Sequence, residues 1–184
     1  MKQIVRIIGG RFRGKKLHFP DLPNLRPTSD RIRETVFNWL MNDIQDKNCL
    51  DAFAGSGALG FEAYSRGACS VTMIEKARQA VFKLKENAES LAMLNRPVKV
   101  HQMDSIHFLK STQSVFDIIF LDPPFKDNQM SECIEIITQR ELLSPDGILY
   151  IESPKEVKMP EKKWQIIKQK KSGQVTYALY KKAV

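Results

Sequence analysis

The sequence predicts an α/β protein with a mostly parallel sheet and helices on both of its faces. Three observations support this fold class. Strand and helix patterns alternate from residue 48 to residue 152, as in consecutive βαβ units. A Gly-X-Gly-X-X-Gly sequence at residues 55–60 lies between a predicted strand and a predicted helix. Residues 116–121 form a nearly unbroken apolar run, which is typical of a strand buried on both faces.

Two short strands are predicted first, at residues 3–8 and 11–17, on either side of Gly9-Gly10. They form a β-hairpin with basic residues on its second strand. A hairpin alone is marginally stable in water, so we expect this one to pack on the main body or on a ligand. We therefore divide the chain into a basic hairpin extension, residues 1–25, and a main domain, residues 26–184.

A helix is predicted after the proline-containing link at residues 20–27. Residues 28–30, Thr-Ser-Asp, are candidate N-caps, and apolar side chains recur at helical spacing as far as Ile44. Arg31 and Arg33 fall in the first turn, where positive charge opposes the helix dipole. A bound phosphate or carboxylate would explain this placement, and a salt bridge to a neighbouring acidic residue is the plainer explanation.

The sheet follows from residue 48 onward. The predicted strands are residues 49–53, 70–75, 98–103, 116–121 and 147–152, and the predicted helices are residues 57–66, 77–94, 105–110 and 131–140. Two further strands, 164–167 and 175–180, are joined by a short lysine-rich segment that ends in Ser172-Gly173. We expect this pair to be antiparallel, because a parallel crossover needs a dozen or more residues.

Charge is distributed unevenly along the 184 residues. Residues 1–33 hold nine Lys or Arg against two Asp, a net +7, and residues 155–184 hold nine Lys against two Glu, again +7. The total is +8, so residues 34–154 carry a net −6. An acidic centre between two basic ends suggests a polyanionic partner that is held outside a central pocket.

Several classes of protein are disfavoured by composition. No apolar run approaches the ~20 residues that span a bilayer, and residues 1–6 are too soon interrupted by charge to resemble a signal peptide. The sparse cysteines and histidines show neither metal-ligand spacing nor a disulfide framework, so we expect a reduced cytoplasmic protein with no metal. These residues are Cys49, Cys69, Cys133, His18, His101 and His107.

The glycine-rich segment predicts a nucleotide or nucleoside site. Gly55, Gly57 and Gly60 let the backbone approach a ligand, and Glu75 ends the next strand, where an acidic residue takes ribose hydroxyls. Two ligands compete for this site, a nicotinamide dinucleotide and S-adenosylmethionine. Asp51, just ahead of the glycines, suits a cationic amino-acid ligand.

Asp104, after the third strand, can accept from an adenine amine. A dehydrogenase would also need a hydride-transfer site and usually a second domain, for which little chain remains. These two considerations favour S-adenosylmethionine.

The segment Asp122-Pro123-Pro124-Phe125 ends the apolar strand abruptly. Proline restricts the residue before it to extended geometry and lacks an N–H, so one carboxylate and stiff carbonyls remain at the strand end. In open α/β sheets, ligands bind at this edge. The acceptors suit an amino group, and the aromatic ring of Phe125 suits stacking on a base.

These motifs resemble those of class I methyltransferases that act on exocyclic amines of bases. Residues 6–17 and 26–40 are more specific and resemble the RsmD family, whose members methylate N2 of a guanine in 16S ribosomal RNA. The resemblance covers residues 4–152 well and the last thirty weakly. Several amine methyltransferases share Asp-Pro-Pro-Phe, so that motif indicates the chemistry better than the substrate.

The resemblance implies a Rossmann-like fold with a seven-stranded, mostly parallel sheet whose last strand is antiparallel, plus the N-terminal hairpin. It implies S-adenosyl-L-methionine as cofactor, and 16S rRNA or the assembling small subunit as partner of a cytoplasmic protein, which we expect to be a monomer. The expected catalytic residues are Asp122, Pro123 and Phe125. The expected cofactor-binding residues are Thr28, Asp51, Phe53, Gly55, Gly57, Glu75, Asp104 and Asp122. The expected RNA-binding residues are Arg11, Arg13, Lys15, Lys16, Arg31 and Arg33.

Three alternatives stay open at this point. The first is an adenine-N6 methyltransferase of DNA or RNA, which would use the same type of motif. The second is a non-catalytic RNA-binding or assembly factor that retains the fold without the activity. The third is a nucleotide-dependent oxidoreductase, which binding of NAD in place of S-adenosylhomocysteine would reveal.

Overall fold

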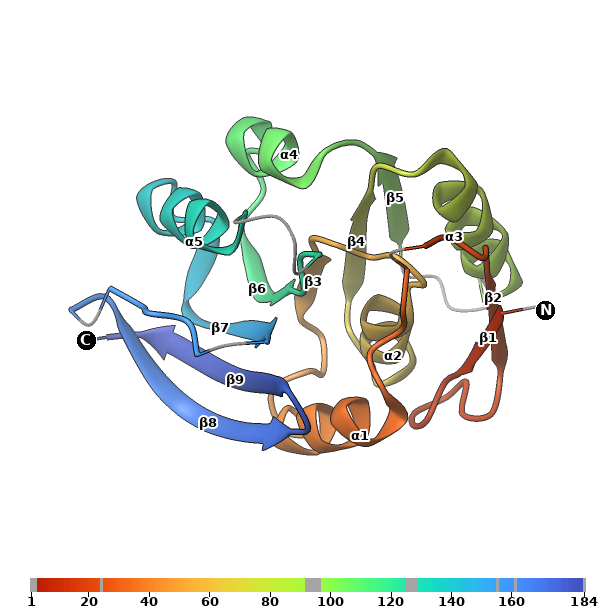
Figure 1. The fold of residues 1–184 in the computed structure, drawn as a ribbon, viewed down its shortest axis with the longest axis horizontal. Helices are drawn as coiled ribbons and strands as arrows, with labels where there is room; N and C mark the ends of the chain where they lie inside the picture. The colour runs from red at the N-terminus through yellow and green to blue at the C-terminus, as the bar shows by residue number, and fades with distance from the viewer. Residues whose placement is uncertain are drawn as a thin grey trace.

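The computed structural model describes residues 3–23, 25–91, 97–124, 129–154, 156–160 and 162–183. Within these residues the chain forms a two-stranded hairpin and a seven-stranded sheet of order β5-β4-β3-β6-β7-β9-β8 (Figure 1). The predicted α/β fold is therefore confirmed. The sheet strands are β3 Asn48–Asp51, β4 Ser70–Glu75, β5 Val98–Gln102, β6 Phe116–Leu121, β7 Leu143–Ser153, β8 Trp164–Ser172 and β9 Val175–Lys182. The helices are α1 Asp30–Trp39, α2 Ala58–Ser65, α3 Arg78–Ser90, α4 Ser105–Ser111 and α5 Gln129–Gln139.

The first five strands of the sheet are parallel to one another, and β9 is antiparallel to both of its neighbours, β7 and β8. The predicted antiparallel pair is thus confirmed. Its boundaries differ from the prediction, because residues 168–171 continue strand β8 rather than forming a connection. Strand β7 also starts earlier than predicted, at Leu143, since Leu143 pairs with Phe116 before a register shift.

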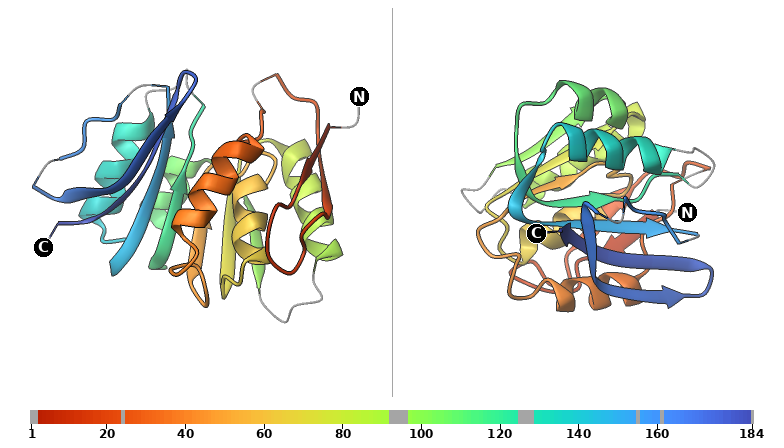
Figure 2. Two further views of the ribbon diagram at one scale, coloured as in Figure 1. Left: turned by 90° about the horizontal axis from the view of Figure 1, so that it is seen from below. Right: turned by 90° about the vertical axis from the view of Figure 1, so that its left-hand side faces the viewer.

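Helices cover both faces of the sheet, as the alternating pattern predicted (Figure 2). Apolar residues of α1, α2 and α3 pack with one set of strand side chains, which includes Phe120, Tyr150 and Tyr177. The alternate side chains, such as Leu121 and Ile151, pack with α4 and α5. Side chains alternate between the two faces along a strand. Near the ends of β6 and β7, the even-numbered residues therefore face α1.

The hairpin packs on the main body. Its strands are β1, Gln3–Arg6, and β2, Lys16–Phe19, and their apolar residues belong to the same core as α1 and α2. The connection, residues 7–15, is longer than the predicted Gly9-Gly10 turn and lies against the end of α2, where Arg11 N–H donates to the Ser65 carbonyl at 2.8 Å. The division of the chain at residue 25 stays a prediction.

Helix α1 begins as predicted, with the Ser29 hydroxyl accepting from the Ile32 N–H at 3.4 Å. It ends at Trp39 and does not continue to Ile44. The side chain of Arg33 has no exposed area and lies between the hairpin and α2. It bonds the Arg6 carbonyl at 3.0 Å and pairs with the buried Glu62 at 3.3 Å.

The prediction that Arg33 binds RNA is therefore wrong. Glu62 also accepts from the N–H groups of Ile8 and Gly9, both at 2.8 Å. A carboxylate in such a position needs a cationic partner, because an unpaired buried charge is strongly destabilising. Arg33 and Arg66 both supply that charge, since Arg66 pairs with Glu62 at 2.8 Å. Arg33 also bonds Asp30 at 2.6 Å, which is the salt bridge to a neighbouring acidic residue that the sequence suggested.

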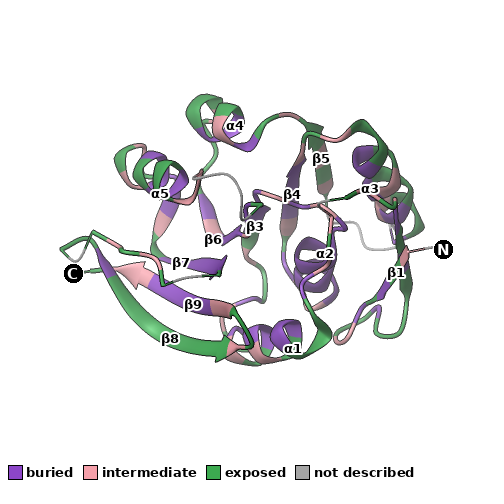
Figure 3. Cartoon of the chain, in the orientation of Figure 1, coloured by how far each residue is buried: buried purple, intermediate pink, exposed green. Residues whose placement is uncertain are grey.

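Parallel strands bring their carboxyl ends to one side of the sheet, which we call the carboxyl edge. Four acidic residues lie at this edge. Asp51 and Glu75 end their strands, Asp122 directly follows β6, and Glu152 is the last residue but one of β7. Helix α2 runs away from it, so its last residue, Ser65, lies at the opposite edge. Helix α2 is buried along its whole length, whereas the outer strand β8 is mostly exposed (Figure 3).

Candidate active site at the carboxyl edge of the sheet

The loop between β3 and α2 contains two glycines with different functions. Gly55 has φ of +49° and Gly57 has φ of +79°, both in the left-handed region that favours glycine. A Cβ on Gly57 would lie 2.5 Å from Phe61 and 2.6 Å from Leu84, so Gly57 is required by packing. A Cβ on Gly55 would meet nothing closer than Leu25, at 3.7 Å. Gly55 therefore presents bare backbone to the open side of the loop.

Glu75 fixes the shape of this loop. Its carboxylate accepts from the Gly55 N–H at 3.0 Å and from the Ala77 N–H at 2.7 Å. The side chain is half-buried, which leaves part of the carboxylate accessible at the carboxyl edge. The structure thus brings Glu75 and the glycine loop together, as predicted, and the binding of ribose hydroxyls by Glu75 stays a prediction.

Asp51 lies beneath the same loop and is 2 % exposed. Its Oδ2 accepts from the Gly60 N–H at 2.9 Å, which ties the end of β3 to the first turn of α2. Burial, together with the charge of Glu75, raises the pKa of Asp51 to about 7, although the bond from Gly60 opposes the rise. A cation placed nearby would lower the pKa of Asp51 and favour its ionised form.

The other predicted cofactor residues lie at the same edge. Asp104 is exposed and caps α4, where its Oδ1 accepts from the His107 N–H at 3.1 Å. Phe53 is half-buried in the glycine loop. These positions agree with a ligand that extends along the ends of β3, β4 and β5.

Asp122 directly follows strand β6 and is half-buried. The hydroxyl of Thr28 donates to its Oδ2 at 3.4 Å, so the segment that leads into α1 meets the end of β6. Pro123 is buried and Pro124 is exposed. The fourth residue of the motif, Phe125, lies outside the described residues, and its predicted stacking on a base stays a prediction.

Glu152 is a site residue that the sequence analysis missed. It is 5 % exposed and accepts from the Tyr150 hydroxyl at 2.7 Å. The β6–β7 register pairs Leu121 with Ile151, so the next two residues, Asp122 and Glu152, are neighbours on the α1 face. Thr28 lowers the pKa of Glu152 as well, so this one hydroxyl influences both carboxylates.

Two signals in the sequence pointed to Glu152. It ends a predicted strand, as Glu75 does, and an acid within a buried apolar strand requires a partner. The sequence alone did not show that β6 and β7 are adjacent and in this register, so it did not bring Glu152 beside Asp122.

The carboxylates at this edge repel one another. Burial and then the charges of Glu152 and Asp51 raise the pKa of Asp122 well above its usual range, and burial raises that of Glu152. Within the described part of the chain, no Lys or Arg forms an ion pair with Asp51, Glu75, Asp122 or Glu152. The site is therefore an acidic one that a cationic ligand would stabilise.

The predicted RNA-binding residues lie in two places. Arg31 is exposed in the first turn of α1, three residues after Thr28 and thus near the carboxyl edge. Arg11, Arg13 and Lys15 are exposed in the connection of the N-terminal hairpin, which contacts the end of α2 at the opposite edge. Lys16 begins β2. The structure therefore separates the hairpin connection from the acidic site.

Neither a metal centre nor a membrane span is found in the part of the chain that the structure describes. Among those residues there is no group of three or more His, Cys, Asp or Glu side chains placed to hold a metal ion. None of the described helices combines the length and the apolar character that crossing a membrane requires.

Comparison with known proteins gives consistent matches. A family model described as "Conserved hypothetical protein 95" matches residues 5–181. The chain is 43% identical over 180 residues to "Ribosomal RNA small subunit methyltransferase D" of Haemophilus influenzae, covering 96% of this chain and 93% of that protein. Among solved structures, the "Putative methyltransferase yhhF from Escherichia coli" superposes with a TM-score of 0.87 at 41% identity, covering 98% of both chains.

A more distant likeness concerns the fold alone. A Thermus thermophilus structure described as "16S rRNA N2 G1207 methyltransferase (RsmC) in complex with AdoMet and Guanosine" has a TM-score of 0.74 at 21% identity. It covers 100% of this chain and 50% of that one. The seven-stranded sheet described above is thus found in a methyltransferase.

Proposed function

Because this chain belongs to the Conserved hypothetical protein 95 family, we propose that it transfers a methyl group to the N2 amine of a guanine in 16S ribosomal RNA, with S-adenosylmethionine as donor. The chain is a small-subunit ribosomal RNA methyltransferase. The cofactor, the modified base and the function of each residue belong to the proposal. The observation that carries it is the acidic site at the carboxyl edge, in which Asp51, Asp122 and Glu152 all have raised pKa values.

The residues present fit S-adenosylmethionine. When bound, this cofactor supplies a methyl group on a positively charged sulfur. Asp51 and the Gly55 backbone would hold its amino-acid part, because an ammonium group would offset the burial and the charge of Glu75 that raise the pKa of Asp51. Glu75 would accept from the ribose hydroxyls, and Asp104 from the adenine amine. The open side of Gly55 is the space that such a ligand needs.

Asp122 and the Pro123 carbonyl would hold the guanine amine. The nitrogen lone pair of that amine is delocalised into the ring, so its reactivity depends on orientation and on acceptors for its hydrogens. In the reaction the nitrogen gains the methyl group and loses one proton, which the ionised Asp122 can take. Thr28 would orient the Asp122 carboxylate through its hydrogen bond, and the charge of Glu152 would raise the basicity of Asp122.

The base must leave its stack to reach a pocket at a sheet edge. Phe125 would stack on it there. Arg31 would hold a phosphate beside the pocket, and the arginines and lysines of the N-terminal hairpin connection would contact RNA farther away. We propose 16S rRNA, free or in the assembling small subunit, as the partner of a monomeric cytoplasmic enzyme.

Methyl transfer from tritiated S-adenosylmethionine tests the proposal. Deproteinised 16S rRNA, assembled small subunits and duplex DNA are incubated with the enzyme, and the labelled nucleosides are separated after digestion. We expect N2-methylguanosine from one of the two ribosomal substrates. Label in N6-methyladenosine would support the adenine alternative and refute the choice of base, and absence of label from every substrate would refute the proposed activity.

A further inference from the structure

We propose that the turn end of the β8–β9 hairpin is an RNA-contact surface, which binds backbone phosphates next to the target nucleotide. We define this surface by Lys168, Gln169, Lys170, Lys171 and Thr176. The inference rests on the proposed function, since the partner is the strand that carries the methylated base. It concerns the lysine-rich end of the chain, which takes no part in the proposed cofactor site or in catalysis at Asp122.

Strand direction places this surface beside the active site. Strand β9 is antiparallel to both β7 and β8, so β8 runs in the same direction as β7 and its last residues lie at the carboxyl edge. Figure 2 shows the β8–β9 turn and the connection of the N-terminal hairpin toward opposite sides of the molecule. The phosphates that flank a base bound at Asp122 are thus closer to the β8–β9 turn than to Arg11.

The register gives a more exact relation. Glu152 pairs with Tyr177, and Tyr177 pairs with Lys170. Asp122, directly after β6, neighbours Glu152 of β7, so Asp122 continues the row that Glu152, Tyr177 and Lys170 form across β7, β9 and β8. Residues that pair directly point to the same face, so Lys170 shares the face of Asp122 and α1. Three strand spacings of about 4.8 Å place the two backbones roughly 14 Å apart.

The hairpin carries a concentrated positive charge. From Trp164 to Lys182 it contains five lysines and no acidic residue. Lys168, Lys170 and Lys171 are exposed, and in the described part of the chain none of the three forms an ion pair. Phosphates are the partner that such lysines fit, because each lysine that binds one releases condensed counterions from the nucleic acid.

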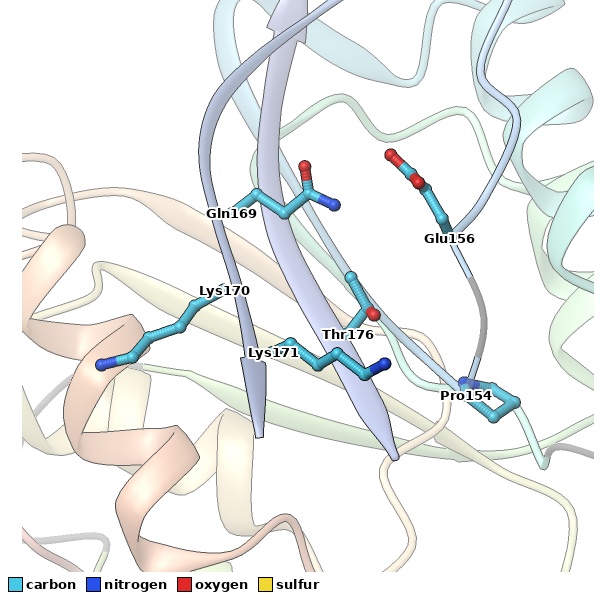
Figure 4. Close-up of a pocket in the computed structure, with 6 residues that line it drawn as sticks. All are labelled: Pro154, Glu156, Gln169, Lys170, Lys171 and Thr176. Atoms are coloured by element: carbon cyan, nitrogen blue, oxygen red, sulfur yellow. The ribbon is translucent and has the colours of Figure 1, made fainter. Parts of the chain in front are cut away.

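A cavity lies at the same place. It has a volume of about 590 Å³ and lies between this surface and the segment that follows β7. Figure 4 shows Lys171 and Gln169 on the side of Glu156, whereas Lys170 extends in the other direction. The lysines would bind phosphate, while Gln169, Thr176 and the Glu156 carboxylate are groups that can bond ribose hydroxyls or base amines.

Lysines on an outer strand also prevent sheets from pairing edge to edge, which would explain them without RNA. The two explanations differ in where the lysines are needed. Any lysine of β8 can prevent edge-to-edge pairing. Phosphate binding next to Asp122 needs the lysines near the β8–β9 turn. Lys162 and Lys163 precede the opposite end of β8, roughly 25 Å away at ~3.3 Å per residue, and both are exposed.

The test compares Lys170→Gln/Lys171→Gln with the matched control Lys162→Gln/Lys163→Gln, which removes the same charge at the other end of the strand. Binding to deproteinised 16S rRNA is measured by filter retention from 50 to 300 mM KCl. We expect the turn variant to flatten the plot of log affinity against log salt by about two units, one for each phosphate that is no longer bound. The control should keep the wild-type slope within about half a unit.

Further measurements separate the outcomes. Affinity for S-adenosylhomocysteine and the melting temperature should match the wild type in both variants, because neither pair lies in the cofactor site or the core. Equal slopes for the two variants would refute the inference. So would loss of methylation on assembled subunits with normal RNA binding, because the turn would then contact a ribosomal protein. If wild-type enzyme methylates no ribosomal substrate, the proposed function fails, and a turn-specific loss of RNA binding would still support the surface.

Discussion

Replacement of Asp122 by alanine is the most direct test of the acidic site. The backbone of Asp122 is held by the β6 ladder before it and by two prolines after it, so the variant should fold normally. Among the residues that the structure describes, its carboxylate accepts one hydrogen bond, a long one of 3.4 Å from Thr28, and it is repelled by Glu152 and Asp51. Removing the carboxylate therefore should not reduce the free energy of unfolding at pH 8.

The expected loss appears in the methyl-transfer step. A preorganised group that stabilises charge developing in the transition state contributes roughly 2–4 kcal/mol, which is about a 30- to 1,000-fold change in rate. The affinities for S-adenosylhomocysteine and for RNA should change little. Asp122→Asn retains one acceptor oxygen, so its rate should lie between those of the wild type and the alanine variant.

Single-turnover methylation with saturating cofactor and RNA measures this step without product release. Asp117→Asn is the matched control, because Asp117 lies on the same strand, at the end away from the active site. Its carboxylate accepts from the Asn48 N–H at 2.9 Å and from Ser144 at 3.0 Å, which asparagine can partly replace. An Asp122→Ala protein that methylates at the wild-type rate would show that this carboxylate is structural.

Four other substitutions test separate parts of the molecule. Gly55→Val should abolish S-adenosylhomocysteine binding in calorimetry, because its side chain would occupy the open side of the loop; unchanged affinity would contradict the cofactor site. Glu152→Gln should lower the pKa of Asp122 and move the acidic limb of the pH–rate profile to lower pH; an unmoved limb would show that the two groups act independently. Asp51→Asn should change the pH dependence of stability. The pKa of Asp51 rises from 3.8 to about 7 on folding, so the wild type loses stability as the pH rises through this window. The loss amounts to at most about 4 kcal/mol. Urea titrations at several pH values should find a smaller loss in the variant. Arg33→Met should cost about 1–3 kcal/mol of stability, because the carbonyls of Arg6 and Thr28 lose a buried donor while Glu62 keeps its ion pair with Arg66; a stable variant with weakened RNA binding would contradict this structural function of Arg33.

Local patterns in the sequence were sufficient for most of the fold. Apolar runs and helical spacing located the elements from β3 to β7, because each pattern extends over several residues and repeats in a regular order. The short connection before Val175 was sufficient to predict that β8 and β9 are antiparallel. Boundaries were less predictable. Residues 168–171 look like a polar loop by composition, and only pairing with β9 makes them a strand.

The candidate site was predictable where it depends on one segment. The glycine loop and the Asp122 segment each combine a strand end with residue types that carry the chemistry, and the rule that parallel strands end at one edge brings them together. Glu75 was predicted for the same reason. These are properties of the chain near each residue, so the sequence by itself determined them.

Only the tertiary structure decided which distant residues meet. Arg33 and Arg31 are two residues apart on one helix, yet Arg33 is buried against Glu62 and Arg31 is exposed. Glu152 joins Asp122 because β6 and β7 are adjacent in a fixed register, and Lys170 joins the same row through β9. Contacts of this kind depend on strand order and helix packing, and a sequence read one segment at a time carries no direct signal for either.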